Sequence, residues 1–266
     1  MKRLMSSSWK FAPILFPFAA LVVGGPQGGR TLEESVAAHG GVERFRAVRD
    51  WSIVADRRLE GDPVVNEIYE EYLLRDVAVE QTLLVKKRGG SVLVFGHDGR
   101  NGFALTDGRL RNDEGAPGEG YYRAHGEYYL RALPFKWLDP GVRAEYAGRE
   151  TADGRELDLL RVTAEENVGK AWKDVWVAAI DRETHLLWEA RLTHHRENET
   201  WMSPPATGTS EITYRYTDYR EVSGLKIPHR LEYYAEGRKT GENVIRTIQI
   251  DSGLTSDLFE LHTHRR

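Results

Sequence analysis

Residues 51–59 read WSIVADRRL, and within this stretch the chain changes from helical to strand periodicity. Apolar Trp51 and Ile53 alternate with polar Ser52, and the alternation continues toward Leu59. A period of two residues is typical of a strand with one buried face, whereas a helix repeats about every 3.6 residues. The stretch therefore predicts a β-strand that opens a long β region.

Similar runs follow along most of the chain. Asp-Gly or Gly-Gly breaks at 89–90, 98–99 and 107–108 separate several of them, as in antiparallel hairpins. The further predicted strands lie at 68–74, 77–85, 92–95, 103–105, 143–146, 156–162, 175–180, 186–192, 212–216, 225–233 and 244–250. Together they predict an antiparallel meander of about a dozen strands.

Helical patterns precede the strands. Thr31 and Glu34 have the spacing of a capping box, and the helix that they begin should stop at Gly40 and Gly41. Residues 42–48 predict a second short helix. Two short amphipathic helices at this place would cover one side of the sheet.

One further helix interrupts the strands. Residues 112–120 read as a loop rich in glycine and acidic residues, and 121–133 predict a helix that Pro134 ends. A long meander has to bury its apolar face by closing, by splitting, or by curling around helices. The fold class that we predict is mainly β with a few helices (α+β). It is a curled antiparallel half-barrel covered by the N-terminal and central helices, enclosing an apolar space.

The first 29 residues have the layout of a secretory signal peptide. Lys2, Arg3 and Lys10 form a basic start, an uncharged run covers 11–23, and small turn-forming residues fill 24–29. We place cleavage after Gly24 and expect one half-barrel domain over 30–266, soluble and periplasmic or otherwise exported.

Charge and cysteine content exclude several functions. Without the leader the chain has 34 basic against 41 acidic side chains (34 − 41 = −7), which gives it no electrostatic reason to bind nucleic acid. The absence of cysteine excludes a lipidated N-terminus, disulfides and thiol chemistry.

The histidines are the natural candidates for chemistry. Adjacent His194 and His195 would point to opposite faces of a strand, and His262 and His264 have no third ligand nearby, so we expect exposed histidines and no metal. His125 lies among tyrosines on the central helix and is interpreted as packed or capping in preference to a catalytic base. The sequence carries no catalytic or cofactor-binding motif, and we expect neither enzymatic activity nor a cofactor.

Aromatic and aliphatic residues expected to face inward could line a ligand cavity or could simply form the core. The ligand-cavity candidates are Trp51, Ile53, Tyr72, Phe95, Tyr121, His125, Tyr128, Trp176, Trp188, Tyr214 and Tyr216.

Four segments carry a resemblance to a known family. They are LPFKWLDPGV at 133–142 followed by YAG at 146–148, HGG at 39–41, DRETHLL at 181–187, and YTDYREVSGLKIP at 216–228. In these the chain resembles exported proteins related to the LolA/LolB lipoprotein carriers, in the outer-membrane lipoprotein-sorting-like branch. The resemblance implies a half-barrel with an apolar concave side under helices, and a role in shielding acyl chains during transit across the periplasm. The chain departs from the typical carrier in being longer and in lacking the lipidated cysteine of the outer-membrane acceptor.

The leading hypothesis is an exported soluble binding protein that holds a lipid or lipoprotein acyl group in an apolar cavity. Its expected partners are those acyl chains, with an envelope membrane protein as a further candidate. The first alternative is an interaction or assembly module of the cell envelope with a filled core. The second is a hydrolase or isomerase that uses His125.

Overall fold

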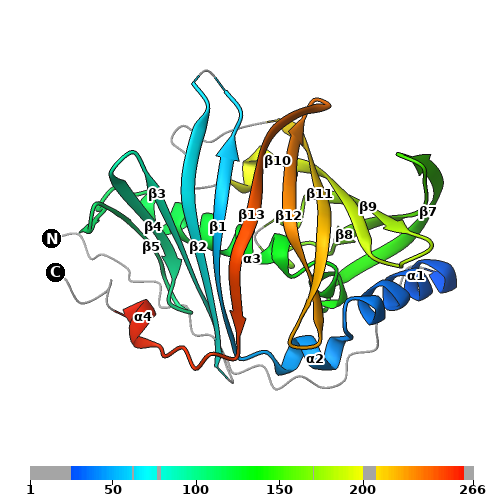
Figure 1. The fold of residues 1–266 in the computed structure, drawn as a ribbon, viewed down its shortest axis with the longest axis horizontal. Coiled ribbons are helices and arrows are strands. Elements are labelled where there is room, and N and C mark those ends of the chain that lie inside the picture. The colour runs from blue at the N-terminus through cyan, green and yellow to red at the C-terminus, as the bar shows by residue number, and fades with distance from the viewer. Residues whose placement is uncertain (1–24, 62, 77–78, 170, 200–207, 261–266) are drawn as a thin grey trace, which may run out of the picture.

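The computed structural model describes residues 25–61, 63–76, 79–169, 171–199 and 208–260. Residues 1–24 of the predicted leader, residue 77 at the start of the predicted strand 77–85, and His262 and His264 lie outside these residues. The described chain forms one antiparallel sheet of thirteen strands with four α-helices (Figure 1). The predicted fold class is therefore confirmed.

The order of the strands in the sheet follows their order in the sequence, with one exception at the centre of the sheet. Their bounds are β1 Asp50–Leu59, β2 Val65–Asp76, β3 Val79–Arg88, β4 Ser91–His97, β5 Gly102–Thr106, β6 Arg109–Leu110, β7 Val142–Ala152, β8 Arg155–Ala164, β9 Val175–Asp181, β10 Leu187–His195, β11 Thr209–Val222, β12 Leu225–Ala235 and β13 Arg238–Ile250. Neighbours in the sheet are neighbours in sequence, except that β1 pairs with β13 and so joins the two arms β1–β6 and β7–β13. The sheet stays open, with β6 and β7 at its edges.

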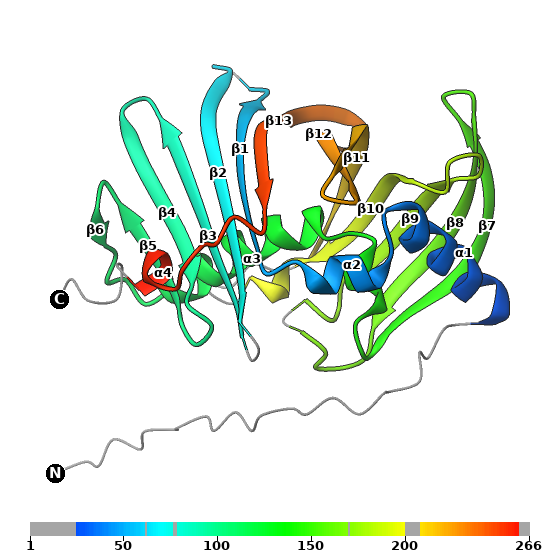
Figure 2. The ribbon, with the colours of Figure 1, turned by 60° about the horizontal axis from the view of Figure 1, so that its bottom comes forward.

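The sheet curls around α3 (Ala116–Arg131), which lies across the concave face (Figure 2). The helix crosses β5 at backbone contact, because a Cβ atom at Gly120 would lie 2.0 Å from the Phe103 carbonyl oxygen and one at Gly102 would lie 1.9 Å from the Pro117 carbonyl oxygen. The helix therefore begins five residues earlier than predicted. The glycines that we interpreted as loop residues permit this close crossing, and Pro117 stands in the first turn, where proline is tolerated.

The N-terminal helices cover the other arm of the concave face. Helix α1 spans Gly25–Ala38 and packs on β7, while α2 spans Val42–Ala47. Helix α1 begins before the predicted cap at Thr31, because Gly28 packs against the backbone of Ala144 in β7 and extends the buried stripe of Leu32 and Val36 toward the N-terminus.

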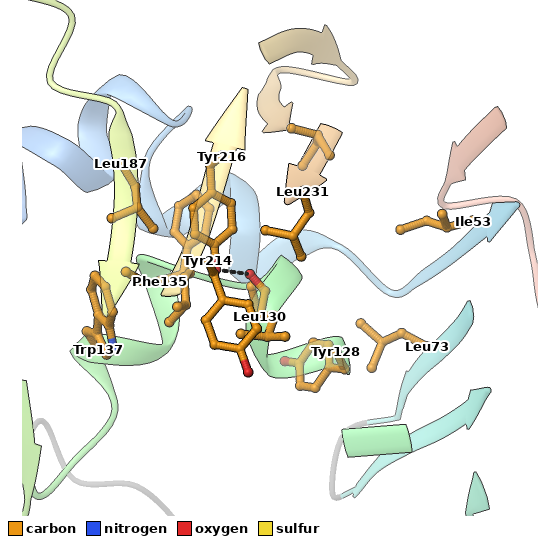
Figure 3. Packing of buried hydrophobic residues seen from close by; sticks show 14 of the residues in the cluster. Ile53, Leu73, Tyr128, Leu130, Phe135, Trp137, Leu187, Tyr214, Tyr216 and Leu231 are labelled. Atoms are coloured by element: carbon orange, nitrogen blue, oxygen red, sulfur yellow. Dashed lines mark hydrogen bonds between the residues drawn. The ribbon is translucent and has the colours of Figure 1, made fainter. Parts of the chain in front are cut away.

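The main core lies on the concave face, between the sheet and α3. Figure 3 shows part of it, where the Tyr216 hydroxyl donates a 3.3 Å hydrogen bond to the Leu130 carbonyl oxygen. Trp51, Tyr128 and Tyr216 are at most 2% exposed. A separate cluster lies on the convex face, where Phe259 of α4 (Asp257–Glu260) packs on β3–β5. The first arm thus buries apolar side chains on both faces.

Candidate functional site

A pocket of about 860 Å³ opens between α3 and the two arms of the sheet. One wall comes from α3, a second from β8–β11, and a third from β1–β3, with further residues from the segment that follows α3 and from the loop after β8. Pockets of roughly 300–1,000 Å³ are typical of small-molecule sites. The pocket lies on the concave side of the sheet, beside α3.

One wall of the pocket is apolar and follows from strand register. Val162, Trp176 and Leu192 stand side by side across β8, β9 and β10, because paired residues of neighbouring strands share a face. The Trp176 ring lies 5.9 Å from the rings of both Tyr129 on α3 and Tyr214 on β11. Three aromatic rings and two aliphatic side chains thus form a continuous surface for an apolar ligand.

The end of the pocket near β1 and β3 is charged. Arg57 points from β1 into the pocket and contacts Glu127 of α3 at 3.0 Å and Glu67 of β2 at 3.6 Å. Burial alone would raise the pKa of Glu127, but the neighbouring cations Arg57 and Lys86 hold it below its usual range. The Glu127 carboxylate therefore stays ionised beneath the helix.

A second charged group lines the pocket at the junction of β2, β3 and the segment after α3. Glu80 contacts Arg75 at 3.2 Å and accepts a 2.7 Å hydrogen bond from the Tyr128 hydroxyl. Lys136 lies 2.5 Å from Asp139 and 3.9 Å from Glu80. Burial acts to raise the pKa of Glu80, and the neighbouring Lys136 overcomes this effect and lowers it. At this junction each of the two cations, Arg75 and Lys136, therefore lies next to a carboxylate.

A buried polar network lies under α3, apart from the pocket lining. Glu71 accepts hydrogen bonds from Trp51 Nε1 at 3.1 Å and from the Tyr69 hydroxyl at 2.7 Å, and lies 3.9 Å from Arg131. Burial raises the pKa of Glu71 to about 7 despite the opposing charge of Arg131. The Arg131 guanidinium has no hydrogen-bond acceptor among the described residues. The network therefore connects the sheet to α3 in two ways. Arg131 pairs with Glu71 without a direct hydrogen bond, and the Tyr69 hydroxyl lies 3.3 Å from the Glu127 carboxylate.

His194 corrects the expectation that the paired histidines are exposed. It is 4% exposed, its Nδ1 lies 3.0 Å from Asp174, and its Nε2 lies 3.1 Å from the Tyr122 hydroxyl. Burial would lower its pKa, but the Asp174 carboxylate outweighs this effect and raises it. The expectation failed because β10 carries His194 on the same face as Leu192, which is the core face. No group of side chains suited to hold a metal occurs among the described residues.

The eleven cavity candidates separate into three sets. Tyr121, His125, Trp176 and Tyr214 line the pocket. The buried concave core away from the pocket contains Trp51, Ile53, Phe95, Tyr128 and Tyr216. Tyr72 and Trp188 lie on the convex face, in the two smaller clusters. These two were expected to face inward. Tyr72 lies on a strand with apolar side chains on both faces, so periodicity alone could not assign its direction. Trp188 lies at a register shift between Leu187 and Glu189, which places it on the face opposite Leu192.

Sequence reasoning missed the charged lining. Arg57, Lys86 and Glu127 line the pocket, yet charged side chains are expected on a solvated face. One signal was present for Arg57, which has the same strand parity as Ile53 and Ala55 and so shares their face.

Comparison with known proteins supports the fold. No family profile and no curated protein matches the sequence. An outer membrane lipoprotein-sorting protein domain from Vibrio parahaemolyticus is similar in structure, with a TM-score of 0.55, 11% identity, and coverage of 90% of this chain and 99% of that one. A DUF1329 family protein from Desulfovibrio piger has a TM-score of 0.55 and 13% identity, covering 88% and 97% of the two chains. A LolA superfamily protein from Nitrosomonas europaea has a TM-score of 0.48 and 10% identity, covering 87% and 96%.

The similarity is one of fold. This chain has the half-barrel architecture of the outer-membrane lipoprotein-sorting proteins, and the resemblance drawn from its sequence is confirmed at the level of the fold. Within the part of the chain that the structure describes, no helix has both the length and the apolar character that crossing a membrane requires.

Proposed function

We propose that this protein is an exported, soluble binding protein that holds a lipid or lipoprotein acyl group in the pocket beside α3. The observation that carries the proposal is the apolar wall of Trp176, Tyr214 and Tyr129 along a pocket of about 860 Å³. The structurally similar domain from Vibrio parahaemolyticus is named an outer membrane lipoprotein-sorting protein, and lipoproteins are the same class of cargo.

The size of the pocket favours a small cargo. Each buried methylene contributes about 0.8 kcal/mol, so one shielded chain of roughly 16 carbons would contribute about 13 kcal/mol. Two or three such chains would contribute roughly 25 to 38 kcal/mol, above the ceiling near 20 kcal/mol for non-covalent affinity. One chain enclosed in the pocket is compatible with both binding and release.

The proposed location follows from the leader. Residues 25–29 begin α1, with Gly28 against β7, so processing after Gly24 would leave the helix intact. We propose that the mature protein starts there, folds as a single domain and works in the periplasm, with an envelope membrane protein as its delivery or receiving partner.

Direct detection of cargo tests the proposal. The protein would be produced with its leader and purified from the periplasm, and native mass spectrometry would be recorded before and after delipidation. We expect bound lipid in the first spectrum and uptake of a fluorescent fatty acid by the delipidated protein. A lipid-free protein that also fails to take up the fluorescent fatty acid would refute the proposal.

The interaction module is the main alternative. Its support is the filled centre of the concave face, where Trp51, Tyr128 and Tyr216 leave almost no exposed surface. This alternative predicts that the protein without lipid still captures a defined envelope protein after crosslinking in intact cells, and that filling the pocket through Leu192→Trp does not weaken capture.

The catalytic alternative depends on His125. This residue lines the pocket, and its ring lies 5.0 Å from Tyr121 and 5.5 Å from Tyr128. An ester substrate screened with the native protein and with His125→Ala would have to show an activity that the substitution removes. We propose no catalytic role, because among the residues that the structure describes the pocket lining contains no cysteine or serine nucleophile next to a base.

A further inference from the structure

Five cationic side chains line the pocket in the described part of the chain, and four of them are neutralised by a carboxylate. These pairs are Arg57 with Glu127 at 3.0 Å, Arg75 with Glu80 at 3.2 Å, Arg123 with Glu119 at 2.6 Å, and Lys136 with Asp139 at 2.5 Å. The fifth cation is Lys86, and no carboxylate of the described residues lies within 4.0 Å of its ammonium group. The pocket therefore holds one positive charge without a direct counter-ion.

Strand geometry places Lys86 on the floor of the pocket. On β3 it shares the concave face with Leu84, because alternate residues of a strand face the same way. Its ammonium group lies 5.8 Å from the centroid of the Phe95 ring, and the Arg123 guanidinium lies 5.3 Å from the same ring. The aromatic face supplies a weak electrostatic attraction, but it offers no hydrogen-bond acceptor of carboxylate strength.

Glu127 and Glu67 attract Lys86 only at a longer distance, and this attraction does not offset the cost of burying its charge. Burial and the neighbouring Arg57 lower the pKa of Lys86 to about 8. The side chain therefore remains protonated at neutral pH while being partly removed from water. A ligand anion at this position would supply a charge-assisted hydrogen bond and offset the loss of solvation.

A series of ring contacts connects the charged end of the pocket, where Arg57 and Lys86 lie, with the apolar wall. The Arg57 guanidinium, next to Lys86, lies 5.3 Å from the Tyr233 ring. The Tyr233 ring is 5.7 Å from Tyr214, and Tyr214 is 5.9 Å from Trp176. A molecule that extends from Lys86 to Trp176 would thus meet a charged end followed by an apolar surface.

We propose that the pocket selects an amphiphile with one anionic head group, a carboxylate or a phosphate, which Lys86 binds while the chain lies against Tyr214 and Trp176. The inference rests on the proposed binding function and adds to it the chemical class of the cargo. The head group's two sources are a free fatty acid and a phospholipid.

Matched ligands and matched variants test the proposal. Delipidated native protein would be titrated with hexadecanoic acid and hexadecanol, and with dipalmitoyl phosphatidic acid and dipalmitoylglycerol, by displacement of a fluorescent reporter. We expect the anionic member of one pair to bind about ten- to hundred-fold more tightly than its neutral partner, as for a hydrogen bond to a charged group. The pair that discriminates identifies the source of the head group.

Lys86→Met should remove this preference and leave the affinity for the neutral ligand unchanged or stronger. The control is Lys87→Met, since Lys87 is the next residue, points to the opposite face and pairs with Glu70. Its preference should equal that of the native protein. Circular dichroism would establish that both variants are folded.

The preference should also decline as the pH rises through about 8, because Lys86 then loses its charge. The charged and titratable groups that face Lys86 are Arg57 of β1, Glu67 and Tyr69 of β2, and Arg123 and Glu127 of α3. Glu127 is held ionised and Arg57 protonated throughout this range.

The outcomes separate the two proposals. Equal binding of the anionic and neutral members in both pairs by the native protein, or an unchanged preference in Lys86→Met, overturns the anionic selectivity while the binding function stands. Failure of all four ligands to bind overturns both the selectivity and the proposed function.

Discussion

Replacing Glu71 with glutamine should change how the stability of this protein depends on pH. Glu71 is 1% exposed, and burial raises the pKa of its carboxyl from the ordinary 4.5 to about 7. The folded protein therefore holds a proton on Glu71 more tightly than the unfolded chain does. The contribution of Glu71 to the free energy of unfolding is fully present below pH 4.5 and is lost as the pH rises through about 7.

The magnitude follows from the size of the shift. A difference of 2.5 pKa units corresponds to about 3 kcal/mol of unfolding free energy. Glutamine resembles the protonated carboxyl and does not titrate, and its amide oxygen can still accept the hydrogen bond from Trp51 Nε1. The free energy of unfolding of Glu71→Gln minus that of the native protein should therefore increase by about 3 kcal/mol between pH 4.5 and pH 8.

Urea denaturation followed by tryptophan fluorescence at several pH values measures this difference. Groups distant from Glu71 titrate in the same way in both proteins, so their contributions cancel in the subtraction. A difference that stays constant to within about 0.5 kcal/mol across the range would refute the reasoning, since it would mean that burial does not hold a proton on Glu71.

Three further results are expected. Gly120→Ala should destabilise the protein by about 1–3 kcal/mol through overlap with the β5 backbone, whereas Gly126→Ala in the same helix meets open space and should stabilise it by about 0.5–1 kcal/mol. Thermal unfolding by circular dichroism measures both, and equal effects would contradict the close crossing. Trp176→Ala should weaken fatty-acid binding roughly ten- to hundred-fold by removing apolar surface, and Trp188→Ala on the convex face should not. A fluorescence titration that ranks them otherwise would remove Trp176 from the site. His39 should titrate with a pKa of about 4 in NMR spectra, because burial opposes its charge. The contribution of neutral His39 to stability is therefore present above pH 6.5 and is lost as the pH falls toward 4. A titration midpoint near 6.5 would contradict this reasoning.

Strand positions were predictable because they depend on local pattern. Trp51, Ile53 and Ala55 of β1 alternate as a half-buried strand requires, and the structure places all three in the main core. The Asp98 turn was also recognisable, since the Asp98 carboxylate accepts hydrogen bonds from the backbone N–H groups of Arg100 and Asn101. The turn at Asp107 and Gly108 was recognisable because both residues adopt the positive φ that an Asp-Gly pair tolerates. Local chemistry was sufficient for these features.

The direction of side chains in doubly apolar strands was not predictable. Residues Tyr72 and Leu73 of β2 are adjacent and apolar, and either could face α3; the structure places Leu73 in the main core and Tyr72 on the convex face. The choice depends on pairing with β1 and β3, which is information from distant parts of the chain.

The charged lining of the candidate site escaped prediction for a related reason. Lys86 and Arg57 lie in separate strands, and only the sheet register and the position of α3 bring them to one pocket. Nothing in the local sequence of either residue distinguishes a cation in a pocket from a solvated one. The start of α3 was predicted wrongly for the opposite reason. The glycines before Tyr121 have low helix propensity and locally favour a loop, but close packing on β5 stabilises a helix there.

The pairing of β1 with β13 governs the order in which this protein can fold. Each arm consists of consecutive hairpins, which can form from neighbouring segments, but Trp51 pairs with Ile250. The middle of the sheet therefore cannot be completed until nearly the whole chain is present, and this late, long-range step is expected to limit the folding rate. Until β13 is available to pair with β1, the two arms are not joined and the main core between them stays incomplete.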